Sequence, residues 1–204
     1  MQNKGFFITL EGGEGAGKST LLEGLTRELL SKGFPVVKTR EPGGSPIAEK
    51  IRQILLHGVG MAPKAELLLF LAARAQHLQE KVVPALEAGS IVICDRFSDS
   101  TIAYQSFARG LPLEEVETLD AIARSHLKPQ LTLLLDIDPE EAFKRISSKG
   151  RDRLEKESVA FHKKVREGFL FLAKRDEERV ILLDARRPTQ EVLDKALQAV
   201  LEVI

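Results

Sequence analysis

The stretch that decides the fold is Gly12-Gly13-Glu14-Gly15-Ala16-Gly17-Lys18-Ser19-Thr20, which satisfies the pattern G-x-x-x-x-G-K-[ST]. It joins a strand-like apolar segment at 6–10 to a helical pattern of leucines at 21, 22, 25 and 29. Glycines let the loop point its N–H groups at one anion, and the N-terminus of the following helix adds positive charge. Lys18 supplies an ammonium for the outer phosphates and Ser19 an oxygen for Mg²⁺. The stretch therefore predicts a loop that binds the phosphates of ATP or another nucleoside triphosphate.

Four further segments have the length and apolar character of strands that are buried on both faces. They lie at 35–39, 90–94, 131–135 and 180–183. Helical patterns separate these segments, and strands that alternate with helices indicate βαβ units. We therefore expect an α/β fold with a five-stranded parallel sheet and helices on both faces. Neither an internal repeat nor a low-complexity linker divides residues 1–204, which predicts a single domain.

The charge balance excludes a broad basic surface. The 204 residues carry 30 Lys and Arg against 30 Asp and Glu, so we expect neither polymeric nucleic acid nor a membrane as partner. The apolar share of 43% argues against disorder, and the longest apolar run, 67–73, is too short to cross a bilayer. The start lacks the pattern of a secretory signal, and the single cysteine, Cys94, fits a reducing compartment. We expect a cytoplasmic protein.

A second acid is expected where a neighbouring strand ends. Asp95 follows the segment 90–94, and parallel sheets gather their ligands at the carboxyl ends of strands. Asp95 is therefore the candidate carboxylate for the magnesium ion. Arg96 beside it has two interpretations, because it either forms a surface ion pair with Asp95 or binds an anion next to the phosphate loop.

A second candidate site follows from residues in several other segments. An Asn-Lys-x-Asp guanine-reading motif is absent from the sequence, which disfavours a GTPase. Phe70 and Arg74 lie on the apolar stripe of a predicted helix, where an arginine needs an acceptor. Arg74 either pairs with a structural carboxylate or donates to the carbonyl edge of a base that stacks on Phe70. Thr101, Tyr104 and Gln105 share one face of a helix expected after the third strand, and they offer polar groups to a base and a sugar.

Two segments near the C-terminus keep alternative interpretations. The segment 147–156 is polar, charged and poor in core residues, so it forms either a solvated loop or a mobile flap that carries Arg151 and Arg153 over a site. The run Ala185-Arg186-Arg187 after the fifth strand either borders an adenine pocket or is solvated.

Six motifs besides the phosphate loop carry a resemblance that runs over essentially the whole chain. They are Phe-Ile-Thr-Leu-Glu-Gly at 7–12, Thr-Arg-Glu-Pro-Gly-Gly at 39–44, Leu-Leu-Phe-Leu-Ala-Ala-Arg at 68–74, Asp-Arg-Phe at 95–97, Ala-Tyr-Gln at 103–105 and Leu-Asp-Ile-Asp-Pro-Glu-Glu-Ala at 135–142. At these residues the sequence resembles the thymidylate kinase family, whose members phosphorylate dTMP with ATP. The second motif combined with the fourth is far more specific than the phosphate loop.

The resemblance implies a P-loop nucleoside monophosphate kinase-like fold and a homodimer. It also implies Mg²⁺-dependent transfer of the ATP γ-phosphate to dTMP, giving dTDP and ADP in dTTP synthesis. The alternatives are a kinase for another nucleotide or small metabolite, and a module that binds ATP to drive assembly. The dTMP contacts implied by position are Glu41 and Pro42 around the monophosphate, Arg52 and Arg96 on its phosphate, Phe70 against thymine, Arg74 at its O4, Thr101 and Gln105 near the base edge, and Tyr104 against the deoxyribose.

The same resemblance assigns the catalytic charges. Glu14 matches an acidic position near the substrates and the metal, and Lys18 and Arg96 act on the phosphates. Some family members carry an arginine directly before Ala-Gly-Lys, where this chain has Gly15. Members without it take the missing cation from a lid, here the short segment 147–156. Arg153 matches the lid pattern best, and Arg151 is the second candidate.

Overall fold

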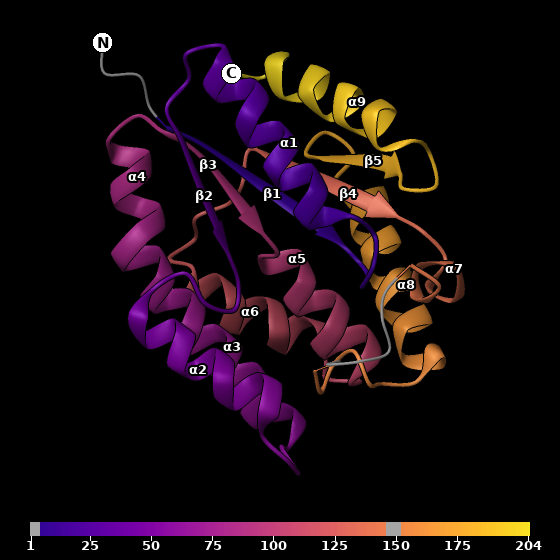
Figure 1. Cartoon of the computed structure of the whole chain (residues 1–204). Coiled ribbons are helices and arrows are strands. Elements are labelled where there is room, and N and C mark those ends of the chain that lie inside the picture. Colours follow the sequence, from indigo (N-terminus) through magenta and orange to yellow (C-terminus); the bar gives the residue numbers. More distant parts are fainter. Residues whose placement is uncertain (1–4, 146–151) are drawn as a thin grey trace.

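The computed structural model describes residues 5–145 and 152–204 (Figure 1). Its five strands pair in parallel in the order β2-β3-β1-β4-β5, which confirms the predicted sheet. Each strand begins and ends within two residues of its predicted segment. The strands are β1 Phe6–Gly12, β2 Val36–Arg40, β3 Ile91–Asp95, β4 Leu131–Asp136 and β5 Val180–Asp184.

Helices connect these strands and cover the sheet (Figure 1). The leucine-striped helix that follows the P-loop ends near its predicted glycine stop, because Gly33 has φ 86° just beyond the last helical turn. The α-helices are α1 Lys18–Ser31, α2 Pro46–His57, α3 Pro63–His77, α4 Val83–Glu87, α5 Ser98–Thr101, α6 Leu113–Ala123, α7 Pro139–Phe143, α8 Val159–Arg175 and α9 Thr189–Leu201, and the π-helical turns are η1 Leu78–Val82 and η2 Ile102–Ala108.

Alternating side chains of β1 supply two separate layers of the core. Ile8 and Leu10 pack in one cluster with Leu25 of α1 and Ala196 of α9, so these two helices cover one face of the sheet. Phe7 points to the opposite face, where it packs with η1 residues. α8 and η2 pack against each other beside β4 on that opposite side. The sheet is therefore buried on both faces, as its continuous apolar strands predict.

Glycines allow two close approaches at the carboxyl edge of the sheet. Gly12 has φ 138°, and a Cβ there would lie 2.4 Å from the carbonyl oxygen of Leu135. Gly44 has φ 84°, and a Cβ there would lie 2.5 Å from the ring of His77. Larger residues would clash and would be strained at both positions. The turn at Gly12 can therefore lie close to the end of β4, and the turn at Gly44 close to the end of α3.

The helix predicted after β3 changes its hydrogen bonding along its length. α5 continues directly into the π-helical η2, and Thr101, Tyr104 and Gln105 are all buried along this element. π-Helical turns often occur at functional sites because they turn side chains away from regular helical positions.

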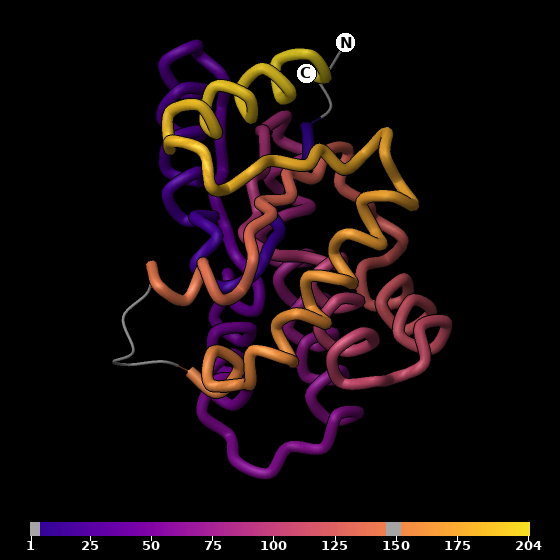
Figure 2. The backbone as a smooth tube through the Cα atoms, turned by 90° about the vertical axis from the view of Figure 1, so that its right-hand side faces the viewer, coloured from indigo at the N-terminus to yellow at the C-terminus, as the bar shows by residue number. Residues whose placement is uncertain are grey.

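The segment predicted to be a flap is described from residue 152 onward, and Arg151 lies outside the described residues. The turn 152–157 lies next to the C-terminal end of α2 (Figure 2), where the backbone N–H of Arg153 donates to the carbonyl oxygen of Leu56 at 3.2 Å. Across residues 5–145 and 152–204, none of the helices is long and apolar enough to cross a membrane.

Candidate active site

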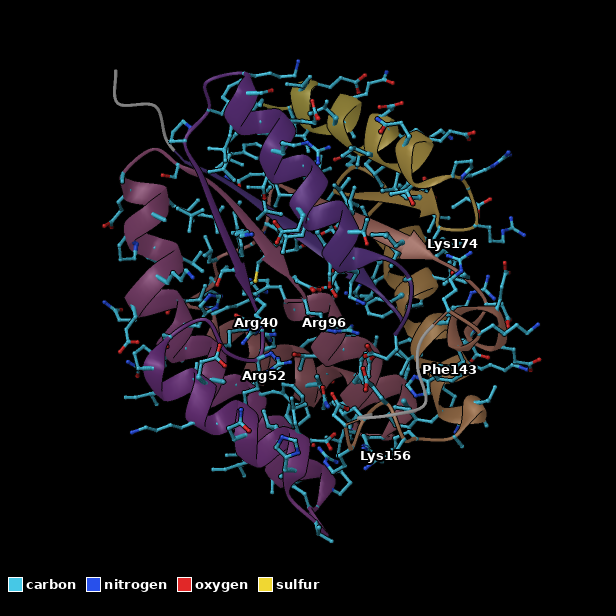
Figure 3. All side chains as sticks on the ribbon, in the orientation of Figure 1. Arg40, Arg52, Arg96, Phe143, Lys156 and Lys174 are labelled. Atoms are coloured by element: carbon cyan, nitrogen blue, oxygen red, sulfur yellow. The ribbon has the colours of Figure 1, made fainter. Side chains whose placement is uncertain are left out.

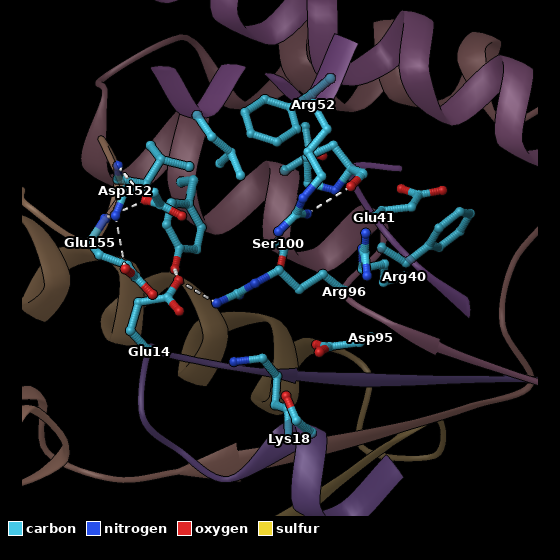
Figure 4. Close-up of a pocket in the computed structure, with 18 of the residues that line it drawn as sticks. Glu14, Lys18, Arg40, Glu41, Arg52, Asp95, Arg96, Ser100, Asp152 and Glu155 are labelled. Atoms are coloured by element: carbon cyan, nitrogen blue, oxygen red, sulfur yellow. Dashed lines mark hydrogen bonds and ion pairs between the residues drawn. The ribbon is translucent and has the colours of Figure 1, made fainter. Parts of the chain in front are cut away.

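A cavity of about 580 Å³ lies where β1, β2 and β3 end, between the P-loop, α2, α3, η2 and the turn 152–157 (Figure 4). Arg40, Arg52 and Arg96 reach it from β2, α2 and the loop after β3 (Figure 3). It brings most of the predicted site residues together. Those that line it are Glu14, Gly15, Gly17, Lys18, Ser19, Thr20, Glu41, Pro42, Arg52, Phe70, Arg74, Asp95, Arg96, Thr101, Tyr104 and Gln105.

The P-loop closes around the ammonium group of Lys18, the first residue of α1. Nζ donates to the carbonyl oxygens of Gly12 at 3.0 Å and Gly13 at 2.7 Å. Burial lowers the pKa of Lys18, and the positive charge of Arg96 lowers it further. The P-loop therefore holds the ammonium group of Lys18 at the wall of the cavity.

Asp95 and Ser19 offer oxygen atoms to a metal ion. The Oδ1 atom of Asp95 is buried, yet it has no hydrogen-bond partner within residues 5–145 and 152–204. Ser19 lines the same cavity with an exposed side chain. Hard oxygen ligands of this kind suit Mg²⁺, which is often held by few protein groups plus phosphate oxygens. The residues present thus fit a magnesium ion.

Arg96 connects the P-loop to the end of β3. Its Nη1 donates to the carbonyl oxygen of Gly12 at 2.9 Å and to Oγ of Ser100 at 3.2 Å. Its Nη2 lies 2.5 Å from Oε1 of Glu14. In the described part of the chain, the carboxylate that pairs with Arg96 is thus Glu14 and not Asp95, so the surface-pair interpretation is wrong.

Glu14 accepts two donors at the same oxygen atom, Oε1. Besides Arg96, the hydroxyl of Tyr104 donates to its Oε1 at 2.9 Å. Burial alone would raise the pKa of Glu14, but the positive charges of Arg96 and Lys18 lower it to about 2. Glu14 is therefore ionised at every pH at which the protein would be assayed.

Arg74 is buried among acceptors of the protein itself. Its Nε and Nη2 bind Oε2 of Glu41, both at 2.8 Å. Its Nη1 donates to Oγ1 of Thr101 at 2.9 Å and to Oδ1 of Asp120 at 2.5 Å. The structural pairing that the apolar stripe left open is therefore confirmed, and the contact of Arg74 with a base stays a prediction.

The remaining residues predicted to bind dTMP differ in how far other contacts already fix their side chains. Arg52 is partly buried, and its Nη1 donates to the carbonyl oxygen of Pro42 at 2.8 Å. The amide Nε2 of Gln105 donates to Oε1 of Glu66 at 3.0 Å. Phe70 is partly buried at the cavity wall, where its ring is available for stacking.

Arg153 does not line the cavity. Its Nε donates to the carbonyl oxygen of Leu55 at 2.9 Å, and its Nη1 lies 2.5 Å from Oε2 of Glu66. The neighbours Asp152, Leu154 and Glu155 line the cavity instead. The expectation that this segment carries Arg153 over the site is therefore not met in the described conformation.

A second cavity of about 310 Å³ adjoins the P-loop on the side of α1 and α9. Ala185 lines it, whereas Arg186 and Arg187 are exposed and pair with Asp184. The segment therefore borders a pocket through its alanine and is solvated at its arginines. Arg145, which the sequence did not single out, lines both this cavity and the larger one.

Glu11 is a buried acid that sequence reasoning missed. Its Oε1 accepts the backbone N–H groups of Phe97 at 2.8 Å and Ser100 at 3.4 Å, and its Oε2 accepts the Ser100 hydroxyl at 2.5 Å. Burial raises the pKa of Glu11 to about 7, and the negative charge of Asp99 contributes to the increase. Glu11 thus ties the end of β1 to the loop that carries Arg96.

Asp120 and Glu66 were also missed, although the sequence held a signal for them. Both are buried on helices, where a carboxylate needs a cationic partner as much as Arg74 needs an anionic one. Searching the apolar stripes for acids as well as for arginines would have found them.

Comparisons with known proteins show the family to which this chain is similar. A sequence model of the thymidylate kinase family matches residues 10–196. A thymidylate kinase from Protochlamydia amoebophila is 46% identical over 206 residues, covering 96% of this chain and 92% of its own length. One from a Geobacillus species is 48% identical over 206 residues, covering 98% of both chains.

A solved structure extends the agreement to the fold. The crystal structure of thymidylate kinase from Ehrlichia chaffeensis superposes with a TM-score of 0.78 at 32% identity, over 96% of this chain and 98% of that one. The chain therefore belongs to the thymidylate kinase family of nucleoside monophosphate kinases, which transfer a phosphoryl group to dTMP.

Proposed function

We propose that the 580 Å³ cavity holds dTMP directly beside ATP on the P-loop, and that Mg²⁺-dependent transfer of the γ-phosphate gives dTDP and ADP for dTTP synthesis. The observation that carries this proposal is the position of Arg96. Its guanidinium contacts the P-loop at Gly12 and Glu14 and also lines the acceptor cavity. One cation can therefore contact the phosphates of both nucleotides.

On the donor side, the loop from Gly12 to Thr20 would surround the ATP phosphates with backbone N–H groups. Lys18 would exchange its two carbonyl contacts for phosphate oxygens. The adjoining 310 Å³ cavity, with Arg145 and Ala185 in its wall, would hold the adenine. When bound, Mg²⁺ neutralises phosphate charge, and Asp95 and Ser19 would hold it.

On the acceptor side, Arg52 and Arg96 would bind the dTMP phosphate, with Glu41 and Pro42 shaping the pocket around it. Phe70 would stack on thymine. Four of the five N–H groups of Arg74 are used by the described contacts, which leaves one on Nη2 for the thymine O4.

Three polar residues would complete the nucleoside pocket. Tyr104 would lie against the deoxyribose, where its ring excludes a 2′-hydroxyl. Thr101 and Gln105 would lie near the base edge, and both are already fixed by hydrogen bonds to Arg74 and Glu66. A pocket that is preformed in this way loses little entropy when it binds its ligand.

For phosphoryl transfer the protein has to position the two substrates and to neutralise the charge of the transition state. The dTMP phosphate is already anionic, so the reaction needs no strong general base, and an oxygen held in line with the γ-phosphorus is sufficient. Lys18 and Arg96 would stabilise the charge that spreads in the transition state. The resemblance adds a lid arginine, Arg151 or Arg153. Arg151 lies outside the described residues, and the side chain of Arg153 contacts Leu55 and Glu66 in the described conformation.

The proposal also includes the domain organisation, the compartment and the oligomeric state. We expect one P-loop kinase domain over 1–204 with a lid at about 147–156, acting in the cytoplasm as a homodimer. Support for the homodimer comes from exposed apolar side chains on three neighbouring helices: Ile47, Ile54, Leu68 and Ile122. Light scattering coupled to size exclusion would measure the mass of the assembly.

A coupled ADP-release assay tests the function. ATP and Mg²⁺ would be offered with dTMP, dUMP, dCMP, dAMP and dGMP in turn. ADP release that requires dTMP and prefers it supports the proposal. Preference for another monophosphate would reassign the acceptor, and ADP release without any acceptor would point to an ATP-driven module.

A further inference from the structure

Glu66 is a buried carboxylate that no proposed catalytic step uses. It lies on α3 with 1% of its surface exposed and accepts three donors from two other parts of the chain. The donors are Gln105 and Arg109, at 3.0 and 3.1 Å, and Arg153 at 2.5 Å. Burial alone would raise the pKa of Glu66, but hydrogen bonding to Arg109 keeps it below its ordinary value. An ionised acid therefore lies between the base edge of the cavity and the turn 152–157.

Arg153 also caps the C-terminal end of a helix. The last carbonyl groups of an α-helix have no partner within it and carry partial negative charge. At the C-terminal end of α2, the backbone N–H of Arg153 donates to Leu56 and its Nε donates to Leu55. Two of the three side-chain nitrogens of Arg153 are thus used, on Leu55 and Glu66, by elements outside its own turn.

Hydrogen bonds and an ion pair hold the turn on both sides of Arg153. The Oδ1 atom of Asp152 accepts the backbone N–H groups of Leu154 at 2.8 Å and Glu155 at 2.9 Å. At its far end, Glu157 lies 2.6 Å from Nη1 of Arg109, which also binds Glu66. The turn is therefore attached to α3 directly through Arg153 and indirectly through Arg109.

This attached turn forms part of the acceptor cavity. Asp152, Leu154 and Glu155 line it (Figure 4 labels the two acids), and Leu154 is buried in one cluster with Tyr104. If the turn moved away from α3, the cavity would lose a wall beside the predicted sugar and base positions.

We propose that Arg153 is a positioning residue: through its ion pair with Glu66 it holds the turn 152–157 as a wall of the acceptor cavity, and so acts on dTMP binding. This inference rests on the proposed function, because it takes the cavity as the dTMP site. It differs from the role that the family resemblance gives Arg153, which is to neutralise charge in the transition state.

The two roles predict opposite kinetics. A residue that shapes the acceptor cavity affects the KM for dTMP, whereas a cation that acts only on the transition state lowers kcat by the order of 10³. For Arg153→Ala we expect the KM for dTMP to rise about tenfold, with kcat within about threefold of the parent and the KM for ATP unchanged. A large fall in kcat with an unchanged KM for dTMP would overturn the proposal.

A double-mutant cycle tests the pair itself. Glu66→Gln keeps the shape of the side chain and the acceptor for Gln105, and it should reproduce the rise in KM. The double variant should be no worse than Glu66→Gln alone, because Glu66→Gln already removes the ion pair with Arg153. Multiplicative effects would show that Arg153 acts without Glu66. The matched control is the exposed pair Arg175 and Glu117, whose variants Arg175→Ala and Glu117→Gln should leave every constant unchanged.

Calorimetric titration of dTMP without ATP separates this inference from the proposed function. The parent should bind dTMP, and Arg153→Ala should bind it about tenfold more weakly. If the variant binds dTMP like the parent, the positioning role is wrong while the function stands. If the parent itself binds no dTMP and releases no ADP with it, the proposed function fails. Should Glu66→Gln not fold, Arg153→Ala still decides, since the Arg153 side chain is 20% exposed and its removal spares the core.

Discussion

Nη2 of Arg96 lies 2.5 Å from Oε1 of Glu14, an ion pair that joins the loop after β3 to the P-loop. In the proposed reaction the guanidinium of Arg96 also donates hydrogen bonds to phosphate oxygens. Glu14 cannot be neutralised by a proton in the assay range because its pKa is about 2. The pair therefore stays charged, and its geometry depends on the planar fork of the guanidinium.

Replacing Arg96 with lysine tests whether that fork is required. Arg96→Lys keeps the charge but loses the simultaneous contacts to Gly12, Ser100 and Glu14. We expect kcat/KM for dTMP to fall about 10²–10³-fold in the ADP-release assay. Arg175→Lys, on the exposed end of α8, is the control and should behave like the parent. If Arg96→Lys were as active as Arg175→Lys, the assignment of Arg96 to the active site would be wrong.

Removing Arg74 should cost stability as well as selectivity. Arg74→Ala removes the cation that the buried Glu41 and Asp120 share and leaves Asp120, among the described residues, only its pair with Arg124, a loss of about 3–5 kcal/mol in the free energy of unfolding. Urea denaturation measures that loss. Arg74→Lys restores a charge and should fold, so the ranking of dTMP, dUMP and dCMP is measured on it. An unchanged ranking would mean that Arg74 supports the pocket without reading the base.

Tyr104 should discriminate through its ring and not through its hydroxyl. The ring packs edge-on against Phe161 and Phe169, while the hydroxyl donates to Glu14. Tyr104→Phe should cost about 1 kcal/mol of stability and keep the preference for dTMP over the ribonucleotide. Tyr104→Ala should lose that preference. Retained selectivity in the alanine variant would contradict the assignment.

Glu11 should make stability fall as pH rises. Its pKa is about 7 in the folded protein and ordinary in the unfolded chain, so the folded state binds more protons between about pH 4.5 and 7. The free energy of unfolding therefore decreases through that window, by on the order of 3 kcal/mol in full.

Glu11→Gln removes this titration while keeping the acceptor for the N–H group of Phe97. The variant should match the parent near pH 5 and exceed it in stability near pH 8, as measured by urea denaturation at both values. A constant difference between the two proteins across this range would show that Glu11 does not titrate there.

The elements that depend on local pattern could be predicted from the sequence, and the partners of buried charges could not. The segment 131–135 is continuous apolar sequence, so β4 follows from burial on both faces alone. Arg74 shows the limit, because its place on an apolar stripe says that it needs an acceptor. Only the fold identifies Glu41 and Asp120 as that acceptor among 30 acids.

Arg153 illustrates a different limit. Its motif resembles that of a lid, but a motif does not state which way a side chain points. The open carbonyl groups at the end of α2 and the buried charge of Glu66 decide its direction, and both come from parts of the chain about 90 residues earlier.

The strand order β2-β3-β1 fixes the spacing between the loops that form the proposed site. Arg40 and Asp95, the last residues of β2 and β3, lie in register with each other, and β1 continues two residues beyond Leu10, the partner of Asp95, to Gly12. Neighbouring strands are about 4.8 Å apart, a spacing that no loop can alter. The sheet therefore fixes the spacing between the strand ends that carry the proposed donor and acceptor sites, and the loops are free to differ in the acceptor that they select.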